Sequence, residues 1–345
     1  MSNCYIVRMA PLDSYFLGGE TTFGEGSEPN YYVVSNKLPQ VSTLLGVIRY
    51  ELLRQRGLLS YSDSQAEMVK KVIGEQGFNL ETQSLSLGII KKMSPLFLEK
   101  NGTFYTPMPL DYGIDAVAKT EDHVECSFSS ACKFNYLSLP KYNCKNYSNY
   151  KYWISGDGNE KVLGNDIFKM KEQIGILSQN RDDDKNGFYK MQSIVLAKGY
   201  RFAFLLETSE DIETVENRQV FMGGNRSMFN MSIESIENIE ELKNMKNVDG
   251  FCQKYFEALH KDGRLLLLGD AYFSDKECDE LPFFWAMRVI NKYLLPRYTA
   301  QGGMSWKRPN KTATYSLLGR GGVIYERETP KCNKELQTVG LNVFI

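Results

Sequence analysis

The chain has 345 residues, 42% of them hydrophobic and 24% charged, which is ordinary for a soluble globular protein with one large or two smaller domains. Its 41 basic and 42 acidic residues give a formal net charge of −1, which argues against a protein that coats nucleic acid indiscriminately. The balance still allows one basic groove, because acidic residues bunch at 121–125, 182–184 and 233–242, away from the basic clusters.

The N-terminal segment Met1–Arg8 reads as a strand and not as a basic segment followed by an apolar one. No run of 18 apolar residues follows it, so we expect a cytoplasmic protein. Seven cysteines without a C-x-x-C pair indicate reduced thiols. His123, Cys126 and Cys132 come nearest to a zinc pattern, but they lack a second ligand pair, so neither a metal nor another cofactor is expected.

The first half of the chain predicts a strand at 5–11, a long polar loop at 12–40, and a helix at 42–57. Ser42 or Thr43 can cap this helix, and Gly57 can end it. Strands are predicted between 85 and 107, with Asn101-Gly102 forming a hairpin turn. Residues 107–160 have no clear period and are interpreted as an irregular, tyrosine-rich insertion.

The second half is predicted to begin with a helical run at 166–173. There follow a strand at 200–208, a glycine-rich turn at 221–229, a polar helix at 236–260, a strand at 264–273, an aromatic helix at 281–295, and closing strands around 316–325. Asp182, Asp183 and Asp184 fit a solvated hairpin turn better than a magnesium site, because adjacent residues of a strand point to opposite faces.

This order of elements predicts the α+β class, with two ferredoxin-like units that each place helices on one face of an antiparallel sheet. We expect an N-terminal RRM-like domain at 1–160, with the long loop and the insertion, and a C-terminal RRM-like domain at 161–345. The chain has only two histidines, His123 and His260, and neither lies beside a nucleophile or in a glycine-rich turn. The sequence also lacks an NTPase phosphate loop, so we expect no enzyme.

Three glycine-rich turns combine exposed backbone with nearby cations: FLGGETTFGEG at 16–26, MGGNR at 222–226 and LLGRGG at 317–322. Glycine backbone N–H groups form concave anion sites, and arginine adds bidentate contacts to phosphate. Together the turns favour binding of an extended polyanion. The alternative is that each is a plain hairpin, with Arg320 a solvated residue on a strand bulge.

The order of motifs resembles the Cmr subunit three family, which belongs to the RAMP superfamily of CRISPR-associated proteins in type III-B effector complexes. The motifs are LDSYFLGG, PQVSTLLGVIR, SPLFLEKNGTFYTPMPLD, GILSQNRDDDKNGFY, FMGGNRSMF, LLLLGDAYF and GGMSWKRP followed by GRGG, and they span nearly the whole chain. The most specific are the P-x-x-S-T-x-x-G-x-x-R segment at 39–49 and the closing pair.

The resemblance implies a non-catalytic subunit that grips the 5′ tag of the CRISPR RNA and docks on the large palm-domain polymerase-cyclase subunit. A backbone-forming RAMP subunit is its expected neighbour, and GRGG stands at the glycine-rich loop of RAMP proteins. The residues assigned to RNA contact are Gly18, Gly19, Arg49, Lys91, Lys92, Arg181, Gly223, Gly224, Arg226, Lys307, Arg308, Gly319, Arg320, Gly321 and Gly322.

Two alternatives remain open from the sequence. Related RAMP endoribonucleases process precursor CRISPR RNA, commonly with a histidine as general acid or base. The equivalent type III-A subunit would perform the same task in a different complex, and neighbouring genes would separate it from a type III-B subunit.

Overall fold

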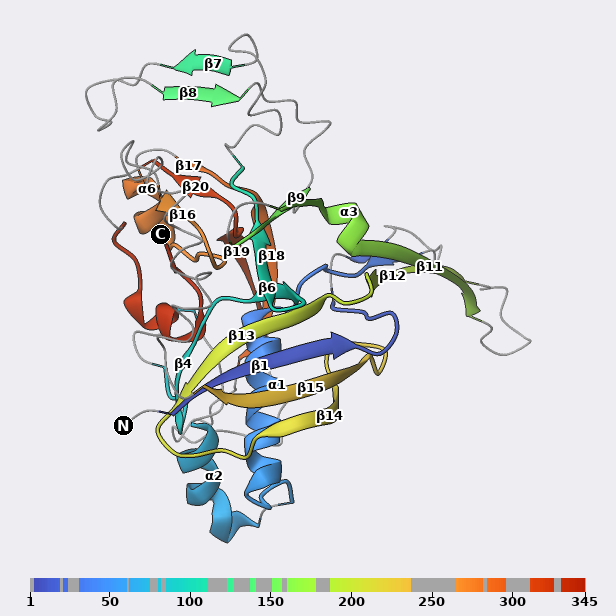
Figure 1. Cartoon of the computed structure of the whole chain (residues 1–345), viewed down its shortest axis with the longest axis vertical. Coiled ribbons are helices and arrows are strands. Elements are labelled where there is room, and N and C mark those ends of the chain that lie inside the picture. The colour runs from blue at the N-terminus through green and yellow to red at the C-terminus, as the bar shows by residue number, and fades with distance from the viewer. Residues whose placement is uncertain are drawn as a thin grey trace.

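The computed structural model describes residues 3–18, 21–23, 31–60, 62–74, 80–81, 85–110, 123–126, 137–140, 151–156, 160–177, 187–236, 265–281, 284–295, 311–325 and 330–344. A nine-stranded antiparallel sheet dominates it (Figure 1). In spatial order the sheet contains β10 (Lys161–Leu163), β9 (Tyr152–Ser155), β6 (Thr103–Pro107), β5 (Phe97–Lys100), β13 (Arg201–Thr208), β1 (Asn3–Pro11), β15 (Met228–Ile236) and β14 (Val215–Phe221). The ninth strand, β4 (Ile90–Met93), also pairs with β13.

Strand β1 lies within this sheet, and its side chains are buried alternately on the two faces. Tyr5, Val7 and Met9 point to the main core, and each is at most 2% exposed. Ile6 and Arg8 point to the other face, as the two-residue period of a strand requires. Burying one large apolar side chain contributes about 1.5–3 kcal/mol, so this alternation fixes the strand's register against slippage.

Two helices contribute to the core on this side, α1 (Val41–Gln55) and α2 (Ala66–Ile73), and Figure 1 shows α1 passing behind the strands of the sheet. The helix predicted at 42–57 is confirmed, and its end is as predicted, since Gly57 has φ +66° just beyond it. The predicted start is wrong. Gln40 is the N-cap residue and its side chain makes no capping hydrogen bond, so neither Ser42 nor Thr43 caps the helix.

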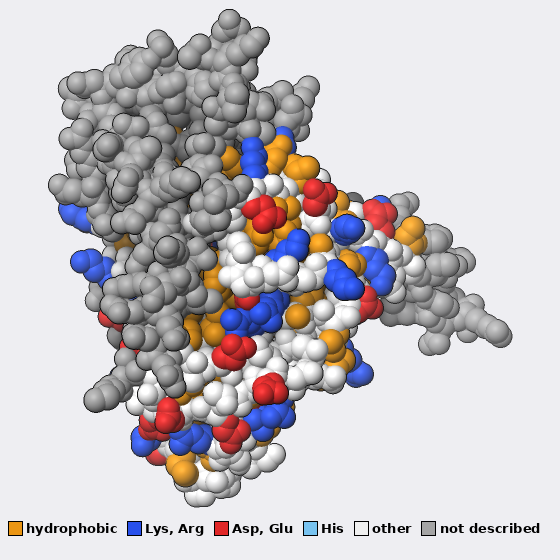
Figure 2. All heavy atoms as spheres, viewed as in Figure 1, with side chains coloured by type: hydrophobic (Ala, Val, Ile, Leu, Met, Phe, Trp, Pro, Cys, Tyr) orange, Lys and Arg blue, Asp and Glu red, His pale blue; other side chains and the backbone are white. Residues whose placement is uncertain are grey.

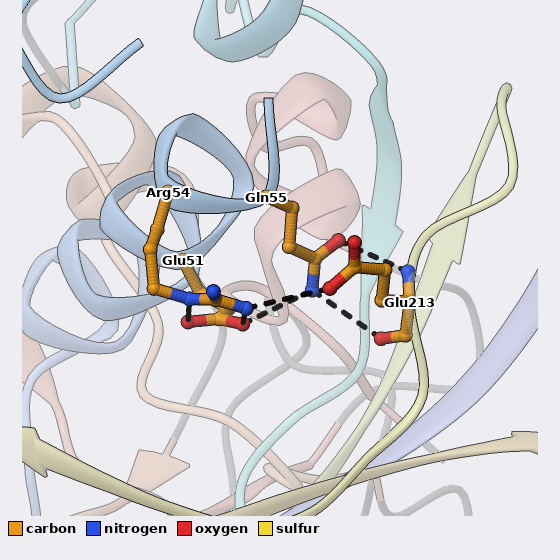
Figure 3. A network of polar contacts seen from close by, with 4 residues as sticks. All are labelled: Glu51, Arg54, Gln55 and Glu213. Atoms are coloured by element: carbon orange, nitrogen blue, oxygen red, sulfur yellow. Dashed lines mark hydrogen bonds and ion pairs between the residues drawn. The ribbon is translucent and has the colours of Figure 1, made fainter. Parts of the chain in front are cut away.

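A polar network ties the end of α1 to the connection between β13 and β14 (Figure 3). The buried Glu51 carboxylate accepts hydrogen bonds from Arg54 Nε at 2.9 Å and Arg54 Nη2 at 2.8 Å. Gln55 Nε2 donates to the Glu213 carbonyl oxygen, and Glu213 N donates to Gln55 Oε1 at 3.0 Å. A buried charge is tolerated here because a bidentate arginine neutralises it.

The predicted Asn101-Gly102 hairpin turn is confirmed between β5 and β6. Asn101 has φ +52° and Gly102 has φ +79°, the left-handed geometry that a two-residue hairpin turn requires. The strand predicted at 200–208 is confirmed as β13.

The second sheet has four strands in the order β11 (Phe168–Leu177), β12 (Gly187–Leu196), β3 (Tyr31–Val34) and β2 (Thr21–Phe23). The helix predicted at 166–173 is wrong, because only α3 (Gly164–Ile167) is helical and β11 follows at once. All ten residues of β11 pair with β12, from Phe168↔Leu196 to Leu177↔Gly187. Long-range pairing overrides a weak helical propensity.

The C-terminal part forms smaller units around a second core cluster. A three-stranded sheet contains β16 (Leu265–Leu266), β20 (Val323–Ile324) and β17 (Phe284–Trp285), and a two-stranded sheet contains β18 (Arg288–Leu295) and β19 (Lys311–Leu318). A further pair is formed by β7 (His123–Cys126) and β8 (Leu137–Pro140). Short helical turns lie at α6 (Asp275–Glu280) and at the 3-10 turn Lys334–Val339.

The aromatic helix predicted at 281–295 is also wrong, because this segment forms β17 and β18. Its β-branched and aromatic residues suit a strand, and β19 supplies a partner along the whole of β18. The predicted closing strands are confirmed as β19 and β20. The polar helix predicted at 236–260 and the aspartates 182–184 lie outside the described residues.

The α+β class is confirmed, but the boundary predicted at residue 160 does not separate two sheets. It falls within the β9–β10 hairpin, where Ile154 is opposite Lys161. Strands from both predicted domains also alternate in the main sheet, since β1 lies between β13 and β15. Among the described residues no helix has the length and apolar character needed to span a membrane.

Candidate nucleic-acid interface

Two of the three glycine-rich turns meet at one end of the main sheet. Phe16 forms an isolated antiparallel bridge with Gly224. Gly224 N donates to the Phe16 carbonyl oxygen at 2.8 Å, and Phe16 N donates to Ser227 Oγ at 2.8 Å. We call residues 15–18 and 222–227 together the glycine junction.

The turn of the glycine junction has a backbone that suits glycine. Asn225 and Arg226 have φ of +57° and +54°, and Ser227 N donates to the Gly224 carbonyl oxygen at 3.1 Å, the pattern of a type I′ hairpin turn. Gly223 has φ +87°, and a Cβ at that position would lie 2.4 Å from the Phe16 carbonyl oxygen. The predicted turn is therefore confirmed, and the close approach of Phe16 requires one of its glycines.

The glycine junction presents exposed backbone and one cation. Gly18, Gly223, Gly224 and Arg226 are all exposed, and nothing lies within 4 Å of a Cβ built on Gly18. No described residue forms an ion pair or hydrogen bond with the Arg226 guanidinium. An anionic chain can thus approach the backbone closely and meet a positive charge there.

The third turn, Gly319–Gly322, lies inside the protein instead. A Cβ on Gly322 would lie 2.6 Å from the Ala286 Cβ, and one on Gly319 would lie 2.8 Å from Val289 Cγ2. Gly321 has φ +83°, and its carbonyl oxygen accepts a hydrogen bond from Leu110 N at 2.9 Å. These glycines therefore admit neighbouring protein segments.

Arg320, expected to neutralise a phosphate, is buried, with a side chain only 2% exposed. Its Nε lies 3.3 Å from Asp270 Oδ1, and its Nη1 donates to the Leu96 carbonyl oxygen at 3.1 Å. The backbone N of Arg320 donates to the same Asp270 oxygen at 3.0 Å. The sequence interpretation is corrected on this point, because Asp270 neutralises the guanidinium and the protein shields it from solvent. The alternative of a solvated arginine is wrong as well.

Three other predicted cations lie apart from the glycine junction. Arg49 Nη2 donates to the Ser86 carbonyl oxygen at 3.0 Å, and burial lowers the pKa of Arg49 to about 10. This arginine therefore packs between α1 and the segment before β4. Lys91 and Lys92 are exposed on β4, where Lys92 is opposite Glu207.

Several predicted residues lie outside the described part of the chain: Gly19, Arg181, Lys307, Arg308, Cys132 and His260. His123 and Cys126 belong to β7, but the positions of their side chains are not described. Among the described residues no group of three or more histidine, cysteine or acidic side chains could hold a metal ion.

The sheet face turned away from α1 carries basic and acidic side chains side by side (Figure 2). Arg8 lies 2.6 Å from Glu99 Oε2 and 2.7 Å from Glu234 Oε2. Arg201 lies 2.8 Å from Glu99 Oε1. Two arginines and two glutamates leave no excess charge in this cluster, so it has no net attraction for a polyanion.

Sequence reasoning missed three contributors to these turns. Phe16 supplies the backbone that packs on Gly223 and Gly224, and Asp270 supplies the charge that neutralises Arg320. Asn225 occupies the first left-handed position of the exposed turn. The position of Asn225 could have been predicted from the sequence, because asparagine is enriched at positive φ in hairpin turns. The other two contacts join residues distant in sequence, and no local pattern reveals them.

No curated protein sequence matches the chain. Solved structures similar to it include two entitled as the type III-B Cmr-beta complex bound to cognate target RNA. One has 11% identity, a TM-score of 0.48 and coverage of 99% of this chain and 96% of the other. The second, also bound to AMPPnP, has 13% identity, a TM-score of 0.43 and coverage of 92% and 85%. A type III-A Csm3–Csm4 subcomplex has 10% identity, a TM-score of 0.38 and coverage of 93% of each chain.

The model of one family, described as CRISPR-associated protein (Cas_Cmr3), matches residues 7–341. This match extends from β1 to the segment after the last 3-10 turn, and so includes both the glycine junction and the Gly319–Gly322 turn. The chain therefore belongs to the Cas_Cmr3 family of CRISPR-associated proteins, the type III-B family that its motifs resemble.

Proposed function

We propose that this protein is a non-catalytic RNA-binding subunit of a type III-B CRISPR effector complex. It holds the 5′ tag of the CRISPR RNA, docks on the large palm-domain subunit and contacts a neighbouring backbone RAMP subunit. Family membership over residues 7–341 supports a place in such a complex. The observation that carries RNA binding is the glycine junction, where two distant turns expose glycine backbone beside Arg226.

The physical basis of this role is contact with the RNA backbone. Gly223 and Gly18 are exposed, and backbone N–H groups at such positions present partial positive charge. The missing side chain of Gly18, around which a Cβ would meet nothing within 4 Å, lets a phosphate come close. Arg226 can donate two parallel hydrogen bonds to one phosphate. Such contacts position a nucleic acid without reading its sequence, so bases of the tag must be read elsewhere.

RNA binding and the absence of catalysis are tested together with labelled tag RNA and the purified protein bound to its large subunit. We expect a retarded complex and no cleavage over hours. Cuts at a fixed position that disappear in His123→Ala or His260→Ala would instead support the endoribonuclease alternative. Absence of any complex with the tag at low salt would reject the RNA-binding role.

Docking is tested by co-expression of the chain with the large palm-domain subunit. We expect one stable complex of one copy each in gel filtration at moderate salt. Two separate peaks at the same salt concentration, each with folded protein, would reject this partner.

A further inference from the structure

The β11–β12 hairpin projects from the body of the protein (Figure 1). Alternate residues of a strand point to opposite faces, so Lys169, Lys171 and Gln173 share one face of β11. All three side chains are exposed. We call these three residues the lysine face.

The opposite face of the hairpin has compensated charge. Glu172 lies 3.0 Å from Lys190 Nζ and also accepts a hydrogen bond from Gln192 Nε2. Lys190 lies over the ring of Tyr32, 5.5 Å from its centroid. Hydrogen bonding between Lys190 and Glu172 lowers the pKa of Glu172 and raises that of Lys190, so both charges are retained at neutral pH.

The lysine face continues into the glycine junction. Gln173 is opposite Met191 in the β11–β12 register, and Asn225 Nδ2 lies 3.4 Å from Met191 Sδ. Asp13, just before the first glycine segment, lies 3.7 Å from Lys171 Nζ. One surface therefore runs from the hairpin to the exposed turn.

This surface has an excess of positive charge that the chain as a whole lacks. Of Lys169, Lys171 and Arg226, only Lys171 forms an ion pair within the described part of the chain, with Asp13, whose side chain is itself 79% exposed. The net charge of the whole chain is −1. This surface therefore carries net positive charge locally, whereas Lys190 on the opposite face of the hairpin is neutralised by Glu172.

We infer that Lys169 and Lys171 extend the glycine junction into a continuous binding site for the sugar-phosphate backbone of single-stranded RNA. The inference rests on the proposed RNA-binding function. The two lysines are two positions apart on a strand, about 7 Å between Cα atoms, so each can meet a different phosphate of an extended chain. Gln173 and Asn225 add neutral donors and acceptors along the same line.

RNA fits this surface better than an acidic protein does. Part of the surface is bare backbone at Gly18, Gly223 and Gly224, which offers little apolar area to a protein partner. A flexible polyanion can follow both the strand and the turn. The lysines would contact its phosphates, so they require no particular base. Binding here adds affinity that depends on salt and not on sequence.

The test compares Lys169→Ala/Lys171→Ala with the matched control Lys190→Ala, which removes a lysine from the opposite face of the hairpin. Each protein is purified with its large subunit and titrated with labelled single-stranded tag RNA and with a scrambled RNA, from about 50 to about 200 mM salt. Each lost phosphate contact lowers the slope of log affinity against log salt by about 0.7, so the double variant should lose about 1.4. Over that range the parent then loses about sevenfold more affinity than the double variant does.

An equal loss of slope for both RNAs in the double variant, with Lys190→Ala like the parent, supports the inference. An unchanged double variant in an otherwise RNA-binding protein overturns the inference and leaves the proposed function standing. A parent that binds neither RNA rejects the proposed function itself. A double variant that binds RNA normally but separates from the large subunit shows that the surface contacts protein, which also overturns the inference.

Discussion

The two described turns that combine glycine with arginine have similar sequences and opposite environments. The Gly319–Gly322 turn is buried, and its Arg320 pairs with Asp270. The turn of the glycine junction is exposed, and its Arg226 has no ion-pair partner among the described residues. In both turns glycines make room for neighbouring protein, since Phe16 approaches Gly223 as closely as Ala286 approaches Gly322. The turns differ in exposure, because Gly223 and Gly224 remain exposed to solvent whereas Gly319–Gly322 are buried. Composition alone therefore does not separate a buried turn from an exposed one that is available for binding, whereas burial and charge pairing do.

The largest expected effect is that of Arg320→Ala on stability. Removing the guanidinium leaves the Asp270 carboxylate, 8% exposed, without its charge partner, which costs about 3–5 kcal/mol of unfolding free energy. Denaturant titration of the purified protein measures the loss. Arg226→Ala is the matched control and should change the unfolding free energy by less than about 0.5 kcal/mol.

The double variant Arg320→Met/Asp270→Leu sharpens the same test. Replacing both members of a buried ion pair by apolar residues avoids an unpaired charge, so part of the lost stability should return. Equal losses in Arg320→Ala and Arg226→Ala would remove the distinction between the two turns.

Gly223→Ala is expected to have the next largest effect. Its Cβ would lie 2.4 Å from the Phe16 carbonyl oxygen, at a backbone φ of +87° that side chains rarely adopt. The strain costs about 1–3 kcal/mol, and tag affinity should fall as the two segments of the glycine junction separate. Gly18→Ala, with open space around its Cβ, is the control and should melt like the parent. Similar melting of both variants would show that Phe16 does not hold the turn.

The ion pair between the buried Glu51 and Arg54, which involves no glycine, allows a test that depends on pH. Burial raises the pKa of Glu51, but hydrogen bonds from Arg54 and Gln55 outweigh it, so the pKa in the folded protein is below the ordinary value. The stabilisation is therefore complete above the unfolded pKa of about 4.3 and is lost as pH falls through the folded pKa. Glu51→Gln should cost about 1 kcal/mol at neutral pH and flatten the acid side of a stability profile. An unchanged profile would contradict this role.

The sequence predicted correctly those helices and turns that are determined by residues close together in the chain. The stripe of α1, the Asn101-Gly102 turn and the glycine turn at 221–229 were all predicted, because each depends on residues within a few positions of one another. Strand β11 was missed because its Lys-Met-Lys alternation covers few residues. Its pairing with β12 depends on residues of a different segment, which no pattern within β11 reveals.

The candidate site was predicted only in part, for a similar reason. Gly223, Gly224 and Arg226 were recognised from one short segment, and the structure confirms that they are exposed. Arg320 has an equally suggestive local sequence, but Asp270 lies fifty positions away and decides its environment. Lys169 and Lys171 were hidden by the incorrect helix at 166–173, whose 3.6-residue period would have spread them over different faces.

The smallest expected effect, Arg226→Gly, distinguishes binding from stability at a single position. Arg226 has φ +54°, and the left-handed region costs a residue with a side chain about 1–2 kcal/mol. Glycine removes that cost but adds about 0.4–1 kcal/mol of unfolded-chain entropy, so the variant should be more stable by about 0.5–1 kcal/mol. The same change should weaken tag binding and lower its salt slope by about 0.7, because one phosphate contact is lost. A gain in stability with a loss of affinity, measured by denaturant titration and RNA titration on the same sample, indicates that the strained arginine is kept for its charge. If the variant instead binds RNA with the parent's affinity and salt slope, Arg226 is only a turn residue. The exposed and buried turns then differ in burial and not in RNA binding.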